Sequence, residues 1–581
     1  MMENTVNLKI NGMPLSVPNG STVLEAARYA GIDIPTLCYL KGINEIGACR
    51  MCVVEVKGAR SLVAACVYPV NEGMEVLTNT PKIQKSRKMT LEMLLSVHNR
   101  DCLACRRSGN CELQTLCNEM GIEQTGRFDG AKPDASRDES TLHLVRDNSK
   151  CILCRRCTAA CAQQHVAVIG PNCRGFDTHI ACAFEKPLND VPCVSCGQCV
   201  VSCPTGALAE RDQCGEVMAA ISDPEKFVVV QTAPAIRATL GECFGMPVGT
   251  NVKGKMVAAL RRIGFDKVFD TNFGADLTIL EEANELIERI QNGGPLPLIT
   301  SCSPGWVKFC EYYYPELLPN VSSCKSPQQM TGAIIKTWYA QKNNIDPKNI
   351  VVVSVMPCTA KKFEIKREDQ NAAGADDVDI AITTRELARL INMAHINFTA
   401  LPDEDFDPAL GVSTGAAAIF GATGGVMEAA LRTAAETLEG RSLESVDYTE
   451  VRGTAGIKEA VYHIGGMDLK IAAVSGLNNA NEILSKVKNG EGGYQFIEIM
   501  CCPGGCVNGG GQPVQPASVR NFTDLKAERA KALYGEDKNL PLRKSHESPL
   551  VQMIYRDFLE KPGSRKAHEI LHTTYASRRK Y

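Results

Sequence analysis

The sequence predicts a multidomain protein in which a cysteine-rich α+β part is followed by a larger α/β part. The chain has 581 residues, too many for one hydrophobic core. Eighteen of its 27 cysteines fall between Cys38 and Cys203, mostly in tight spacings. From about residue 225, short apolar runs alternate with helical stretches, which is typical of α/β domains with parallel sheets.

Composition and charge limit the classes of function. Apolar residues make up 44% and charged residues 22%, as in ordinary globular proteins. A net charge of −3 argues against nucleic acid or an anionic membrane as a partner. The N-terminal residues lack an export signal, and no apolar run of about 18 residues appears. We therefore expect a cytoplasmic protein whose cysteines bind metal rather than form disulfides.

Local patterns divide the chain into four expected domains. Residues 1–80 have alternating strands around the turn Asn11-Gly12 and a capping box, Thr22 with Glu25, that opens a helix over 23–29. Residues 81–125 are helical with a cysteine-rich insert, and residues 126–212 carry two similar cysteine units behind a polar linker at 126–148. The fourth domain, 213–581, has these expected elements: strands at 227–230, 297–300, 350–354 and 379–382, and helices at 252–264, 280–291 and 384–393. Its last 60 residues are charged and predicted to be loop-rich.

The first cysteine group lies in the strand-rich domain. Its members are Cys38, Cys49, Cys52 and Cys66. Four thiolates from one loop and a distant strand suit a [2Fe–2S] cluster. The alternatives are a zinc site or buried structural thiols. The long first gap resembles plant-type and complex-I-type ferredoxin domains, which implies a β-grasp fold and favours the cluster.

The second group combines one histidine with three cysteines: His98, Cys102, Cys105 and Cys111. His98 precedes Cys102 by four residues, so on a helix both would face one metal. The alternatives are a surface histidine or a zinc site. The flanking sequence, with Cys-Glu-Leu-Gln at 111–114, resembles the His-Cys₃ [4Fe–4S] segment of the electron-entry subunit of complex I.

Two further runs are the most specific ligand patterns. They are Cys151-x2-Cys154-x2-Cys157-x3-Cys161 and Cys193-x2-Cys196-x2-Cys199-x3-Cys203-Pro204. Both match the bacterial two-cluster pattern, in which the fourth cysteine of each run binds the other cluster. One [4Fe–4S] cluster should take Cys151, Cys154, Cys157 and Cys203, and the other Cys161, Cys193, Cys196 and Cys199. Cys173 and Cys182, between the runs, are interpreted as ordinary thiols.

Three loops of the α/β part place thiols after apolar runs: residues 300–306, 356–364 and 498–513. Loops at the ends of parallel strands are where such folds build sites. With the cysteine-rich domains, these loops resemble [FeFe]-hydrogenases from about residue 5 to 580. The resemblance implies the reaction 2H⁺ + 2e⁻ ⇌ H₂ at an H-cluster, a [4Fe–4S] cubane joined to a two-iron unit with CO, cyanide and dithiolate ligands. Three [4Fe–4S] clusters and one [2Fe–2S] cluster would feed it.

The resemblance also assigns residues. Cys358, Cys502 and Cys506 match cubane ligands, and Cys506 matches the bridge to the two-iron unit. Lys361 matches a lysine that donates to a cyanide of the two-iron unit. Four further residues match positions that line the H-cluster site: Met356, Met500, Pro234 and Gln328. From composition alone, Lys361 would be a solvated lysine and both methionines core residues.

A proton path is implied in the same way. The matching residues are Cys302, Glu282, Ser322, Glu285 and Arg289. Glu282, Glu285 and Arg289 share one face of a helix. Without the resemblance, this face would be interpreted as a charged surface.

The first loop departs from the family pattern. The family has two adjacent cysteines, a relay thiol and a cubane ligand, where this chain has Cys302 and Ser303. Serine is a poor ligand for an iron–sulfur cluster. Cys302 could ligate the cubane, Ser303 could ligate as an alkoxide or leave the site open, or the roles could be reversed. We favour Cys302 as the ligand, which makes a slow or H₂-sensing enzyme an alternative.

The expected partners follow from the same resemblance. They are ferredoxin, NADH-dehydrogenase-like flavoprotein subunits of an NADH-coupled or bifurcating complex, and maturation proteins for the two-iron unit. The chain has no glycine-rich nucleotide loop after a strand, so an NADH site would lie on a partner. A second alternative is an electron-transfer subunit of a complex-I-like assembly, against which the cysteines of the last loops argue.

Overall fold

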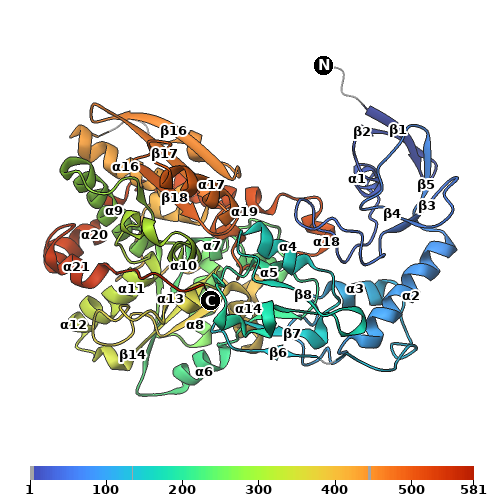
Figure 1. The fold of residues 1–581 in the computed structure, drawn as a ribbon. Coiled ribbons are helices and arrows are strands. Elements are labelled where there is room, and N and C mark those ends of the chain that lie inside the picture. The colour runs from blue at the N-terminus through green and yellow to red at the C-terminus, as the bar shows by residue number, and fades with distance from the viewer. Residues whose placement is uncertain (1–4, 134, 443–445, 581) are drawn as a thin grey trace. The chain divides into compact units, whose positions relative to one another are not determined.

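The computed structural model describes residues 5–133, 135–442 and 446–580, which form two units (Figure 1). The first unit contains Met1–Val191, Gln198–Ala209 and Val514–Thr523, and the second contains Pro192–Gly197, Glu210–Pro513 and Asp524–Tyr581. The first four residues, on which the expectation of no export signal partly rests, lie outside the described residues. No helix in the described part of the chain is both long and apolar enough to span a membrane.

The first unit begins with a five-stranded sheet of order β2-β1-β5-β3-β4. Its elements are β1 (Thr5–Ile10), β2 (Met13–Pro18), α1 (Val23–Tyr29), β3 (Val53–Val56), β4 (Val63–Ala64) and β5 (Met74–Leu77). The strand β1 pairs antiparallel with β2 and parallel with β5. The expected capping box at Thr22 and Glu25 opens α1. This sheet with one helix agrees with the β-grasp expectation.

The remaining elements of the first unit are mostly short, and most of its other cysteines lie in the segments between them. These elements are α2 (Pro81–Val97), α3 (Glu112–Glu119), β6 (Arg137–Asp138), β7 (Leu144–Asp147), α4 (Arg156–Gln163), β8 (Ile169–Asn172), β9 (His179–Cys182), α5 (Gln198–Ser202), β10 (Leu208–Glu210) and α18 (Ala517–Arg520). The expected linker at 126–148 therefore contains two strands, β6 and β7, which pair antiparallel.

The second unit is built on a parallel sheet of order β12-β11-β14-β15. Its strands and helices are α6 (Cys214–Ser222), β11 (Phe227–Thr232), α7 (Pro234–Arg237), α8 (Lys253–Ile263), β12 (Lys267–Asp270), α9 (Asn272–Asn292), α11 (Pro327–Ile334), α12 (Ala340–Asn343), β14 (Ile350–Met356), α13 (Lys361–Glu364), β15 (Ile380–Thr383) and α14 (Thr384–Met393). Val228 and Val230 pack into one core, whereas Val229 packs into another. Both faces of the sheet are therefore buried, as its continuous apolar strands predict.

A second sheet has the order β13-β18-β17-β16. Its elements and the helices that follow are β13 (Leu298–Ile299), α10 (Pro304–Tyr313), α15 (Gly415–Ala418), α16 (Gly425–Glu439), β16 (Ile457–Ile464), β17 (Met467–Ser475), α17 (Leu477–Lys488), β18 (Phe496–Met500), α19 (Leu525–Asn539), α20 (Pro549–Ile554) and α21 (Arg565–Leu571). Strands β13, β18 and β17 are parallel, and β16 adds an antiparallel hairpin. Figure 1 shows β16, β17 and β18 side by side.

Helix α9 belongs to the cores of both sheets. Phe273 and Leu277 pack with the first sheet, whereas Ala275, Ile279 and Leu286 pack with the second. The expected helix at 280–291 thus starts earlier, at Asn272, and is enclosed along much of its length. This enclosure matters because α9 carries the acidic residues of the expected proton path.

The α/β prediction is confirmed, but the expectation for the last 60 residues was wrong. Three helices, α19 to α21, lie where loops were expected. The sequence of α19 is rich in alanine, lysine and glutamate, which favour helices even without a clear apolar face. Asp524 caps this helix by accepting from the backbone N–H groups of Lys526 and Ala527. Charge alone was therefore a poor guide to the absence of structure.

Candidate active site and metal centres

The main candidate site is a pocket at the carboxyl ends of strands in the second unit. The segments that follow β11, β13, β14 and β18 all contribute to its wall, and its empty volume is about 820 Å³. Parallel strands end at one edge, which explains how loops distant in sequence meet there. The sulfur-bearing and hydroxyl residues of the wall are Cys196, Thr271, Cys302, Ser303, Cys358, Cys501, Cys502 and Cys506, with Met356 and Met500 beside them.

Three of these thiols influence one another directly. Burial raises the pKa of the Cys506 thiol to about 12, and the Cys502 thiol adds to the rise. Burial also raises the pKa of the Cys358 thiol, with Cys502 and Cys506 as the next causes. Thiolates crowded into such a site need bound cations to offset their charge. This donor set therefore fits an iron–sulfur cubane.

The third loop reaches the pocket because its glycines allow close packing. A Cβ atom on Gly505, whose φ is +95°, would lie 2.7 Å from the backbone nitrogen of Thr423. A Cβ atom on Gly509 would collide with the carbonyl oxygen of Pro357, next to Cys358. Only glycine permits this approach, which brings the second and third loops together.

Lys361 is a buried residue of the pocket wall, not a solvated lysine. Its Nζ donates to Glu364 Oε2 at 2.8 Å and to the carbonyl oxygen of Cys302 at 3.2 Å. Gln328 also donates to Glu364 Oε2, at 2.9 Å. Pro234, Met356, Met500 and Gln328 all line the pocket. The wall is thus mostly apolar, with one fixed cation and one amide.

The first loop places Cys302 and Ser303 in different surroundings. Burial and the nearby carboxyl of Glu282 raise the pKa of the Cys302 thiol well above its usual value. Ser303 Oγ instead accepts a hydrogen bond of 3.1 Å from the backbone nitrogen of Cys501. Cys302 is therefore associated with the acidic face of α9, and Ser303 with the third loop.

Of the residues expected to form a proton path, Ser322, Glu285 and Arg289 are joined by hydrogen bonds, and Cys302 and Glu282 are electrostatic neighbours. Glu282 is fully buried, and its Oε1 accepts from the backbone nitrogen of Ser301 at 3.4 Å. Ser322 Oγ donates to Glu285 Oε2 at 2.7 Å, and Glu285 Oε1 pairs with Arg289 Nη2 at 2.6 Å. The alternative of a charged surface face is therefore wrong for Glu282, because α9 is enclosed by both sheets.

Burial sets the chemistry of Glu282. Desolvation, followed by the charge of Glu285, raises the pKa of its carboxyl to about 8, although the Ser301 backbone and the Ser322 hydroxyl oppose the rise. Its Oε2 atom has no hydrogen-bond partner among the described residues. A carboxyl with these properties can hold a proton near neutral pH and transfer it.

The four cysteines of the first group come together in the β-grasp domain, outside its strands. Cys52 Sγ lies 3.3 Å from Cys66 Sγ, and the thiols of Cys49 and Cys66 both interact with the Cys38 thiol. The backbone nitrogen of Cys38 donates to Cys49 Sγ at 3.4 Å. Such N–H donors to sulfur are suited to holding thiolates, so the geometry supports the [2Fe–2S] proposal.

The helical argument for His98 was wrong. Helix α2 ends at Val97, and His98 has an extended backbone. His98 and Cys102 therefore do not share a helix face. His98 is nevertheless buried, burial lowers the pKa of its imidazole to about 4, and its Nδ1 has no hydrogen-bond partner in the described part of the chain. A neutral, unpaired imidazole is the form that binds metal, so the ligand proposal stands on burial instead.

One of the two ferredoxin-type ligand sets encloses a second cavity, of about 390 Å³. Cys151, Cys154, Cys157 and Cys203 all line it. This set takes three cysteines from the first run and one from the second, as the two-cluster pattern requires. The other set, Cys161, Cys193, Cys196 and Cys199, stays a prediction.

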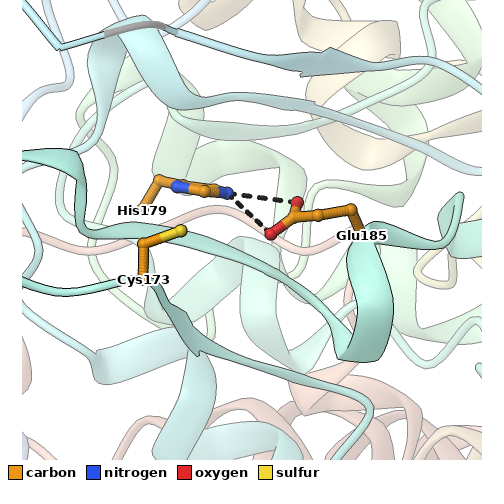
Figure 2. Close-up of side chains that lie close together, drawn as sticks. All are labelled: Cys173, His179 and Glu185. Carbon is orange, nitrogen blue, oxygen red and sulfur yellow. Dashed lines mark hydrogen bonds and ion pairs between the residues drawn. The ribbon is translucent and has the colours of Figure 1, made fainter.

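Cys173 has neighbours that its sequence position did not suggest. Its thiol, the His179 imidazole and the Glu185 carboxylate offer ligand atoms within 4.8 Å of one another (Figure 2). His179 Nε2 lies 3.1 Å from Glu185 Oε1, and its Nδ1 lies 2.9 Å from the carbonyl oxygen of Asp177. Cys173 and Glu185 are exposed, and a surface histidine–carboxylate pair accounts for these contacts, so we assign no metal to them.

Comparisons with known proteins agree with this arrangement. Residues 226–510 match the "Iron only hydrogenase large subunit, C-terminal domain" family, and residues 523–578 match "Iron hydrogenase small subunit". Residues 3–81 match a 2Fe-2S iron-sulfur cluster binding domain, and residues 87–125 match the NADH-ubiquinone oxidoreductase-G iron-sulfur binding region. The match over residues 523–578 covers helices α19, α20 and α21.

Curated proteins extend the match over nearly the whole chain. The "NADP-reducing hydrogenase subunit HndD" of Solidesulfovibrio fructosivorans is 50% identical, with 99% of both chains covered. "Iron hydrogenase 1" of Clostridium pasteurianum is 45% identical, with 97% of this chain and 99% of the relative covered. A solved [FeFe]-hydrogenase, HydA(deltaEFG), is 40% identical, has a TM-score of 0.56, and covers 63% of this chain and 99% of its own.

The chain therefore belongs to the iron-only, or [FeFe], hydrogenase family. It is a multi-cluster hydrogenase with N-terminal iron–sulfur domains and a C-terminal H-cluster domain. The alternative of a pure electron-transfer subunit with a degenerate C-terminal scaffold is excluded by these matches.

Proposed function

We propose that the strand-end pocket is where this hydrogenase interconverts protons, electrons and H₂, and that its own residues deliver protons along α9. The observation that carries the proposal is a row of interacting groups, here called the proton line: the Cys302 thiol and the Ser322 hydroxyl both interact with the Glu282 carboxyl, and Ser322 is hydrogen-bonded to Glu285, which pairs with Arg289. An H-cluster, when bound, supplies the redox-active iron. Cys358, Cys502 and Cys506 would hold its cubane.

In this proposal, the wall residues position the cluster and exclude water. Lys361 is held by Glu364 and the Cys302 carbonyl, so its ammonium group is directed to the pocket as a fixed donor. Met356, Met500 and Pro234 keep the surroundings apolar. In an apolar site, hydrogen bonds and charges act more strongly than in water.

The N-terminal domains would supply the electrons. We assign one [2Fe–2S] cluster to Cys38, Cys49, Cys52 and Cys66, and three [4Fe–4S] clusters to the sets that contain His98, Cys151 and Cys161. The second cavity supports the assignment of one [4Fe–4S] cluster to the four cysteines that line it, Cys151, Cys154, Cys157 and Cys203. Density or spectra that show zinc at the set of His98 would contradict that assignment.

The electron partner is proposed to be an NAD(P)H-linked flavoprotein subunit, with ferredoxin as the alternative donor. A relative named as an NADP-reducing hydrogenase subunit and the match to the NADH-ubiquinone oxidoreductase-G region support this choice. The purified chain alone should produce H₂ from a reduced viologen dye but not from NADPH. Turnover of NADPH by the isolated chain would place the nucleotide site within it and contradict this proposal.

The direct test of the function is infrared spectroscopy together with H₂ assays. Protein expressed with maturation proteins should show the CO and cyanide bands of an H-cluster and should evolve H₂. Cys506→Ser should remove both, whereas Cys310→Ser, a buried cysteine outside the pocket, should retain both. A parent protein with full iron content but without bands and without activity would refute the function.

The second candidate function is slow or sensory H₂ binding. Ser303 in the ligand position of the family is the observation that favours it. Under this alternative, Ser303→Cys raises the turnover rate of a correctly loaded enzyme by tenfold or more. An equal or lower rate in that variant favours a catalytic enzyme whose loop works as it stands.

A further inference from the structure

The pocket contains one thiol that the family pattern leaves without a role. The family's cubane needs four thiolates, and the sequence matches supply three of them, Cys358, Cys502 and Cys506. The fourth family position is occupied by Ser303. Cys501 also lines the pocket and is 4% exposed, but no position of the pattern accounts for it.

Cys501 lies directly beside the position of the missing ligand. Its backbone nitrogen donates to Ser303 Oγ at 3.1 Å, so the two residues are in contact. Its sulfur lies against Gly305, where an added Cβ atom would come within 2.7 Å of Cys501 Sγ. The absence of a side chain at Gly305 therefore leaves room for a sulfur atom at this point of the first loop.

The Cys501 sulfur is also next to two assigned ligands, Cys196 of a ferredoxin-type set and Cys502 of the cubane. The thiols of Cys196 and Cys502 are hydrogen-bonding neighbours of the Cys501 thiol. Cys501 thus contacts Cys502, the cubane ligand of the third loop, through its thiol, and it contacts Ser303 of the first loop through its backbone.

Cys302 is placed differently. Its thiol is influenced by Glu282, the inner residue of the proton line, and its carbonyl oxygen is held by Lys361 Nζ. Use of Cys302 as an iron ligand would take away the thiol that connects the pocket to Glu282. The geometry therefore favours separate roles for the two cysteines.

We propose that Cys501 supplies the fourth thiolate of the cubane, while Cys302 remains the relay thiol and Ser303 positions Cys501 through its backbone. The inference rests on the proposed function of the pocket. Binding forms one iron–sulfur bond and releases the thiol proton, with no change of oxidation state. A thiolate is a far better ligand for this cluster than a serine alkoxide.

The test uses the full-length chain expressed without maturation proteins, so that only iron–sulfur clusters are present. Iron content and Mössbauer spectra of ⁵⁷Fe-enriched protein are compared for the parent, Cys501→Ala, Cys302→Ala and the control Cys310→Ala. We expect Cys501→Ala to lose between about one and four irons per chain, as the cubane loses one iron or is lost. Cys302→Ala and the control should keep the spectrum of the parent.

A double variant guards against simple misfolding. Ser303→Cys combined with Cys501→Ala returns the fourth thiol to the family position, so it should restore the lost iron. If Cys501→Ala keeps the parent spectrum and Cys302→Ala loses the cubane, Cys302 is the ligand and the inference is overturned. If only Ser303→Ala alters the spectrum, serine is the ligand and the inference is equally overturned.

The result is separable from a failure of the proposed function. If the parent, loaded with the two-iron unit, shows no CO or cyanide infrared bands, the proposed function fails. If the parent shows those bands but all cubane iron is retained in Cys501→Ala, the function stands and only the assignment of Cys501 fails.

Discussion

Replacement of Glu282 by glutamine is the sharpest test of the proton line. Glutamine has nearly the same shape as glutamate, so the packing of α9 between the two sheets should survive. It cannot exchange a proton at neutral pH, and it would interrupt the line between Cys302 and Ser322. We expect H₂ evolution to fall by roughly 10²- to 10⁴-fold, the usual contribution of a positioned acid or base, while the infrared bands of the H-cluster remain.

The structure also gives the pH dependence and its sign. Burial raises the pKa of the Glu282 carboxyl from 4.5 to about 8, so between these values the folded protein holds a proton that the unfolded chain releases. Stability therefore falls as the pH rises through this window, and the full penalty is present above it. At 1.36 kcal/mol per pKa unit, the penalty is about 5 kcal/mol. The stability of Glu282→Gln should not fall over this pH range.

The assay combines three measurements on the parent, Glu282→Gln and the control Glu288→Gln. Glu288 is an exposed residue of the same helix, so its replacement should change neither activity nor pH dependence. Infrared titration should show a protonated carboxyl in the parent that disappears with a midpoint near pH 8 and is absent from Glu282→Gln. Activity within about twofold of the parent in Glu282→Gln would refute the proton line.

Three other outcomes are expected. Arg529→Met breaks a buried ion pair, because the guanidinium of Arg529 lies 2.6 Å from a carboxylate oxygen of Glu242. The change should destabilise the protein by about 3–5 kcal/mol and lower its thermal unfolding temperature. An unchanged unfolding temperature would contradict this expectation. Lys361→Met should weaken retention of the two-iron unit and shift the cyanide infrared bands, with cubane iron unchanged; unshifted bands would remove Lys361 from the site. Gly509→Ala should lower the cubane content, because the added Cβ atom would collide with the second loop. Gly535→Ala is the control and should keep the cubane, because Gly535 has open space around it. Equal iron content in both variants would contradict the packing argument.

Local ligand spacing was readable in the sequence because metal binding imposes it. The runs around Cys151 and Cys193 place thiols two or three residues apart, and the structure gathers Cys151, Cys154, Cys157 and Cys203 around one cavity. The capping box at Thr22 and the strand β14 were likewise local signals. The helical turn assumed for His98 failed, because the ligand pattern does not require a helix and α2 ends at Val97.

The sequence by itself determined the class of this protein, because cysteine spacings and glycine-rich loops are short-range requirements of metal clusters. Only the tertiary structure decided which thiol lies beside Ser303 and whether the carboxyl of Glu282 is buried. Cys501 and Ser303 are nearly 200 residues apart, and their hydrogen bond exists because β13 and β18 pair in parallel. The helix α9 looks like a charged surface helix in sequence, but two sheets enclose it. Burial, and with it the pKa of Glu282, depends on that long-range packing.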